Sequence, residues 1–164
     1  MRAVLPNPNK EFPVRKPVNA LLAALMVVGG GGVITLSSAT SAAAATPTCN
    51  TVKSVEGYNK GLIRVPAYSA TGSTTCALTQ GNSGAAVLEL QKALNKCFYN
   101  AYGSNQSYWP LAEDGDFGPN TKKALTEAQD YHTNVPADID GVYGPITRDM
   151  LLWRSATYNN CWFF

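Results

Sequence analysis

The segment DGDFGPNTKKALTEAQ, residues 114–129, has a partial copy that starts 26 residues further on, DGVYGPITRDMLLW at residues 140–153. Asp, Gly, an aromatic residue, Gly, Pro and Thr occur at the same offsets in both segments. Asp-Gly is a turn dipeptide, and Gly-Pro fits a helix start with Gly at the N-cap and Pro at the first helical position. Each copy therefore predicts a tight turn that leads into a short helix.

Apolar residues recur at helical spacing just before the repeat. One stripe, with Ser83 as its expected N-cap, consists of Val87, Leu90, Leu94, Cys97 and Phe98. The two repeat helices are expected to end near His132 and Arg154, the second with Ile146, Met150 and Trp153 on one face. Such short helices are not stable alone, so Phe117 and Tyr143 are expected to fill the space between them. The sequence predicts an all-α fold, a small three-helix bundle.

The N-terminal 45 residues have the features of a secretory signal peptide. A run without charge, Ala20–Leu36, separates a basic start from a small-residue stretch that suits cleavage after Ala45. An uncleaved membrane anchor is the alternative, but the run has 17 residues, four of them Gly, and a span needs about 20. We expect three parts: a signal peptide (1–45), an irregular N-terminal extension (46–80), and a domain with a C-terminal tail (81–164).

The charge of the chain depends on that leader. The whole sequence has a net charge of +2, but residues 46–164 contain nine basic and ten acidic residues, a net charge of −1. A strongly basic surface is the usual mark of a nucleic-acid partner. The exported part is therefore expected to bind no nucleic acid and to make no stable membrane insertion.

All four cysteines lie in the exported part, which predicts two disulfides. Three pairings are open. We favour Cys49–Cys76, which ties the extension to the start of the domain, and Cys97–Cys161, which ties a helix end to the C-terminal tail. The sequence has no C-x-x-C motif and a single histidine, His132, so no metal or other cofactor is expected.

Three segments in order resemble the bacterial peptidoglycan-binding domain of three helices that accompanies many cell-wall hydrolases. Their matching residues are Gly81, Gly84, Val87, Leu90, Gln91 and Leu94, then Asp114, Gly115, Phe117, Gly118, Thr121, Ala124 and Gln129, then Asp140, Gly141, Gly144, Thr147 and Leu151. The chain departs from the family pattern at Ala128, where an aromatic residue is usual, and in the longer link at residues 99–113.

The resemblance implies a cell-wall ligand. With the leader and the residues above, we expect a secreted, non-catalytic monomer that binds peptidoglycan, through its glycan strand or stem peptide, outside the cell or at the cell wall. Residues expected to bind this ligand are Tyr108, Trp109, Asp114, Phe117, Asp140, Tyr143 and Arg148. Each also has a structural interpretation. The two aspartates can cap their own turns, Gln91 and Gln129 can bond the facing turns, the aromatic rings can fill the core or cover helix ends, and Arg148 can be a solvated surface residue.

Two other functions remain open on sequence alone. The scaffold could serve as a protein-interaction or inhibitory module, with the aromatic loop at residues 99–113 facing a protein partner. It could also be a small peptidoglycan hydrolase that uses two carboxylates. The acids available for that chemistry lie mostly in or beside the Asp-Gly turns, which the fold itself needs: Glu113, Asp114, Asp116, Asp138 and Asp140. We therefore expect no enzyme.

Overall fold

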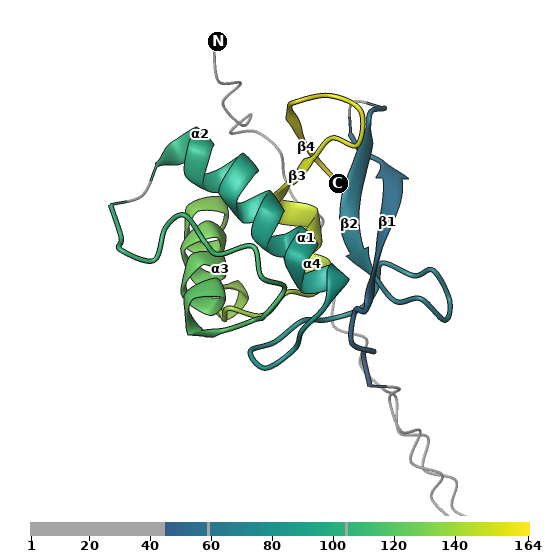
Figure 1. Ribbon diagram of the computed structural model, residues 1–164, viewed down its shortest axis with the longest axis horizontal. Helices are drawn as coiled ribbons and strands as arrows, with labels where there is room; N and C mark the ends of the chain where they lie inside the picture. The colour runs from purple at the N-terminus through teal and green to yellow at the C-terminus, as the bar shows by residue number, and fades with distance from the viewer. Residues whose placement is uncertain (1–44, 59, 104) are drawn as a thin grey trace, which may run out of the picture. The chain divides into compact units, whose positions relative to one another are not determined.

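The computed structural model describes residues 45–58, 60–103 and 105–164, which belong to one compact unit. The predicted signal peptide, apart from Ala45, lies outside the described residues. Figure 1 shows the arrangement, with helix α1 between a β-hairpin on one side and helix α3 on the other. No helix in the described ranges is long and apolar enough to cross a membrane.

The helices follow the predicted pattern closely in the first two segments. Helix α1 (Ala85–Ala93) continues into a π-helical turn, η1 (Leu94–Tyr99), and a short α2 (Asn100–Tyr102). All five residues of the predicted apolar stripe are buried. The predicted N-cap is wrong, because Gly84 occupies that position without any side-chain cap. Its φ of 110° is a left-handed conformation that glycine adopts at little cost.

Both copies of the repeat begin a helix with Gly at the N-cap and Pro at the first position, as predicted. Helix α3 spans Pro119–His132, and α4 spans Pro145–Met150 after a single 3₁₀ turn, η2 (Pro136–Asp138). Helix α4 ends four residues before its predicted end at Arg154. The predicted apolar face of this helix is also wrong, because Ile146 is exposed and Trp153 lies on a strand.

The prediction of an all-α three-helix bundle is wrong, because the fold contains two small antiparallel sheets. Strands β1 (Thr51–Glu56) and β2 (Leu62–Ala67) form a hairpin, with Thr51 opposite Ala67 and Glu56 opposite Leu62. The extension is therefore not irregular. Burial alternates along the first four residues of β2, where Ile63 and Val65 are buried and the other two are exposed, and β2 packs on α1. This period of two marks a strand with one buried face.

The second sheet forms at the C-terminus. Strand β3 (Leu152–Arg154) pairs with β4 (Cys161–Phe163), with Trp153 opposite Trp162. Trp153 is fully buried, and its indole N–H donates to the carbonyl oxygen of Arg148 at 2.8 Å. Because this bond uses a carbonyl from the last turn of α4, it helps to end the helix and turn the chain into the strand.

The core lies between α1, α3 and the hairpin, and both aromatic residues of the repeat are inside it. Trp153, Tyr143 and Phe117 are the largest fully buried side chains among the described residues. The expectation that Phe117 and Tyr143 fill the space between the elements is confirmed.

Both disulfides have the favoured pairing, Cys49–Cys76 and Cys97–Cys161. The first links residues at the two ends of the hairpin segment. The second links η1 to β4, so the C-terminal tail is attached to the helical part of the domain.

Candidate functional site

A buried glutamine holds the first Asp-Gly turn in place. The side-chain amide of Gln91, from α1, donates to Asp114 Oδ1 at 2.7 Å and to the carbonyl oxygen of Asp116 at 3.0 Å. It also donates to Thr121 Oγ1 at 3.2 Å, and its oxygen accepts the backbone N–H of Gly115 at 2.8 Å. One side chain therefore satisfies polar groups throughout the turn and in the first turn of α3.

The second turn repeats this network. The amide of Gln129, from α3, donates to Asp140 Oδ1, Val142 O and Thr147 Oγ1, each at 3.1 Å. Its oxygen accepts the N–H of Gly141 at 2.8 Å. Gly141 has φ 68°, and an added Cβ would lie 2.7 Å from Thr126 Oγ1, so only glycine fits here. The repeat is thus a structural unit in which each helix fixes the turn that follows it.

The two repeated aspartates cap their own turns. Asp114 Oδ1 accepts the N–H of Asp116 at 2.9 Å, and Asp140 Oδ1 accepts the N–H of Val142 at 2.8 Å. The bond from the Asp116 N–H, together with the Gln91 amide, holds the pKa of the Asp114 carboxyl below its ordinary value of 3.8. Both turns thus use the hydrogen bonds expected from the structural interpretation of these residues.

The lowered pKa of Asp114 predicts a pH-dependent contribution to stability. A carboxyl with a depressed folded-state pKa stabilises the fold above its unfolded-state pKa, and this contribution is lost as pH falls through the folded-state value. We expect the stability difference between wild type and Asp114→Asn to shrink as pH falls below 3.8. Urea unfolding from about pH 6 to about pH 2.5 measures it. A difference that is the same at every pH would contradict this assignment.

The aromatic loop is fastened to α3 by one carboxylate. Glu127 Oε2 accepts the indole N–H of Trp109 at 2.7 Å and the hydroxyl of Tyr108 at 2.8 Å. Trp109 is only 8% exposed and stacks on Tyr99 with ring centroids 5.4 Å apart. Desolvation and the Glu127 carboxylate raise the pKa of Tyr108 to about 12. Glu127 was not identified from the sequence. Its only indication there is that an acidic residue lies on a helix next to an aromatic loop.

The remaining predicted ligand residues also have partners within the protein. Arg148 donates to the hydroxyl of Thr74 at 2.8 Å, pairs with Asp149, and lies 3.9 Å above the ring of Phe164. Phe117 is 1% exposed. Tyr143 is fully buried, and burial raises its pKa; its hydroxyl has no hydrogen-bond partner among the described residues.

The seven predicted residues thus do not form one cluster. Tyr108 and Trp109 share Glu127, while the two aspartates and Arg148 belong to three other networks, and Phe117 and Tyr143 lie in the core. Their assignment to ligand binding stays a prediction.

An open groove runs along α3 beside the aromatic loop. This α3 groove has a volume of about 640 Å³, and its lining includes Tyr108, Lys122, Lys123, Glu127, Asp130 and Ile139. Of these residues, sequence analysis identified only Tyr108. The volume lies within the range of roughly 300–1,000 Å³ that is usual for ligand sites.

An exposed group of rings lies at the C-terminal end of α3. Tyr102 and Tyr131 have ring centroids 4.1 Å apart and are 37% and 56% exposed. We call this pair the aromatic platform. Phe98 and His132 contact both rings, and burial lowers the pKa of His132 to about 4, so its imidazole is neutral at neutral pH. Tyr131 is one helical turn beyond Glu127, so the two side chains lie on the same side of α3.

Comparison with known proteins gives one result. Residues 83–151 match the model of a family described as "Putative peptidoglycan binding domain". This range covers α1 to α4 and both Asp-Gly turns, and it excludes the hairpin and the two C-terminal strands. No curated protein and no solved structure matched the chain.

Proposed function

We propose, from the match of residues 83–151 to the peptidoglycan-binding family model, that the protein is an exported, non-catalytic module that holds peptidoglycan on the surface of α3. The observation that carries the proposal is the position of the aromatic platform, whose Tyr131 lies one helical turn beyond Glu127 of the α3 groove lining. Tyrosine rings can stack on the apolar C–H faces of sugar rings, and the groove supplies the polar partners of an elongated ligand.

The proposed absence of catalysis is supported by the surroundings of the repeated carboxylates. A glycosidase needs one carboxyl that can donate a proton and a second that can act as base or nucleophile. Asp114 and Asp140 instead accept hydrogen bonds from a glutamine amide and from their own turns. The low pKa of Asp114 keeps it ionised, which is the opposite of what a general acid requires.

Export is supported by the two disulfides, because such bonds persist in oxidising compartments outside the cytosol. The domain would then meet the cell wall in the environment in which its fold is stable. Reversible docking would keep the protein close to that wall.

Sedimentation with purified insoluble peptidoglycan tests the proposal. We expect the wild-type protein to pellet saturably, and Tyr131→Ala to weaken binding about fivefold, because one stacked ring contributes about 1 kcal/mol. Tyr58→Ala is the matched control, since Tyr58 is also exposed but lies in the turn between β1 and β2. This control should pellet like wild type.

Three other outcomes have definite meanings. Wild type that stays in the supernatant would reject wall binding and favour a protein-interaction module on the same scaffold. Saturable pelleting that Tyr131→Ala leaves unchanged would place the ligand elsewhere than on α3. A fall in the turbidity of wall suspensions that depends on Asp114 and Asp140 would show a hydrolase.

A further inference from the structure

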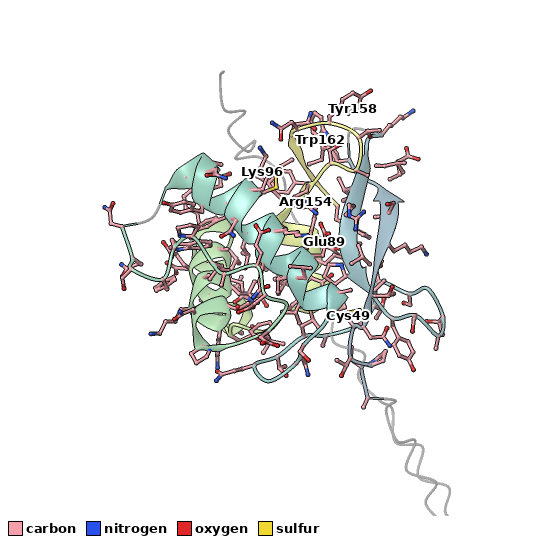
Figure 2. All side chains as sticks on the ribbon, in the orientation of Figure 1. Cys49, Glu89, Lys96, Arg154, Tyr158 and Trp162 are labelled. Carbon is pink, nitrogen blue, oxygen red and sulfur yellow. A yellow bond between two sulfur atoms is a disulfide. The ribbon has the colours of Figure 1, made fainter. Side chains whose placement is uncertain are left out.

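A second pocket lies at the C-terminal tail, and half of its lining residues lie outside the family match. This tail pocket has a volume of about 290 Å³, and its lining includes Lys92 and Lys96 from the helix, Glu113, and Arg154, Tyr158 and Asn160 from the tail. Figure 2 shows Lys96 and Arg154 beneath the loop that carries Tyr158. Residues after 151 belong to this protein's own tail.

The charges around the tail pocket favour an anion. The guanidinium of Arg154 is paired with the carboxylate of Glu89, which is 3% exposed. The distances are 2.7 Å between Glu89 Oε1 and Arg154 Nη2 and 3.0 Å between Glu89 Oε1 and Arg154 Nε. Neither Lys92 nor Lys96 forms an ion pair within the described ranges. Two lysines against the single carboxylate of Glu113 leave the pocket with a positive charge.

The position of the lysines strengthens this argument. Lys92 and Lys96 are four residues apart, where α1 passes into η1. Like charges at this spacing repel each other and destabilise a helix, which an anion placed between them would reverse. The π-helical turn that carries Lys96 is also a feature frequently found at functional sites.

The walls of the pocket are held firmly. The disulfide joins Cys97, next to Lys96, to Cys161, next to Asn160. It therefore links the helical side of the pocket to the side formed by the tail. The two strands that flank the tail loop, β3 and β4, are also paired. A pocket fixed on both sides loses little entropy when it binds a ligand.

We propose that the tail pocket binds the terminal carboxylate of a short peptide. The lysine ammonium groups would pair with the carboxylate, and the amides and hydroxyls of the tail would bond the adjacent peptide group. A volume of about 290 Å³ is at the small end for ligand sites, so the pocket holds a chain end rather than a long segment. The source, a stem peptide of the wall, rests on the proposed function.

The probe that tests this site is N-acetyl-D-alanyl-D-alanine, compared with its C-terminal amide, because the two differ only in the terminal charge. Titration of the oxidised protein is followed through its backbone amide NMR signals. We expect saturable shifts at Lys96 and at residues 155–160, and binding of the amide about tenfold weaker, as charged hydrogen bonds are lost. Lys92→Gln with Lys96→Gln should weaken binding of the acid by a similar factor.

The matched control is Lys53→Gln with Lys60→Gln, which removes the same charge from the exposed β1–β2 hairpin, outside both pockets, and should leave peptide affinity unchanged. Equal affinity for acid and amide, shifts confined to other residues, or no effect of the Lys92 and Lys96 substitutions would overturn the proposal. Binding to insoluble peptidoglycan is measured separately, by sedimentation. A protein that pellets but fails this titration disproves only the tail pocket, and one that binds the peptide but does not pellet disproves only wall binding.

Discussion

Replacement of Cys97 and Cys161 by alanine is expected to lower the free energy of unfolding by about 4 kcal/mol. The disulfide joins residues 64 positions apart, and the loop that it closes contains both Asp-Gly turns, α3 and α4. Closure of such a loop restricts the unfolded chain over most of the domain, and the effect grows with loop length. Alanine is preferred to serine because Cys97 is buried, where a hydroxyl would need a partner.

Urea unfolding of the oxidised proteins measures this loss. The control is the same experiment in reductant, where wild type should fall to the stability of a protein without disulfides. Replacement of Cys49 and Cys76, which are 27 positions apart, should cost slightly less, about 3.5 kcal/mol. A loss below about 1 kcal/mol for the Cys97 and Cys161 pair would show that the unfolded chain is already restricted without the cross-link.

Replacement of Gln91 by methionine is expected to lower the free energy of unfolding by about 3 kcal/mol. Methionine has a similar volume, so the change removes hydrogen bonds with little effect on packing. The buried N–H of Gly115 would lose its acceptor, and Asp114 and the Asp116 carbonyl would each lose a donor. A buried donor without a partner costs about 1–3 kcal/mol, and the two lost acceptor bonds add to this.

Two comparisons make this prediction specific. Gln129→Met should cost about the same, because the second turn has the same network, whereas Gln80→Met at an exposed position should stay within about 0.5 kcal/mol of wild type. Combined with Asp114→Asn, Gln91→Met should be non-additive, since the two side chains share a bond. Additive losses would show that the bond between Gln91 and Asp114 contributes little to the stability of the domain.

Several features could be predicted because neighbouring residues determine them. The apolar stripe from Val87 to Phe98 recurs at the period of a helix, and the start of α3 follows from Gly118 and Pro119. The repeat itself predicted that Phe117 and Tyr143 would be buried and that Gln91 and Gln129 would bond the facing turns. The even number of cysteines predicted two disulfides, and the structure contains the favoured one of the three possible pairings.

The candidate ligand surface was less predictable, because the exposure of a ring depends on residues far away in sequence. Trp109 was expected to bind the ligand, yet both Trp109 and Tyr108 donate hydrogen bonds to Glu127 of α3. Tyr131 was not among the residues expected to bind the ligand, yet it is exposed beside Tyr102. Both outcomes depend on how the loop crosses α3.

The sequence by itself determined the duplicated turn-and-helix unit, the glutamines that bond its turns, and the aromatic residues that fill its core, because their patterns are local or repeated. Only the tertiary structure decided that residues 51–67 form a hairpin, since Ile63 and Val65 are buried by α1 rather than by their own neighbours. The same is true of the tail, whose strands pair and whose pocket exists because Cys161 is held against Cys97. Three-residue strands have too little pairing to form alone, so their structure depends on a contact that local sequence does not encode.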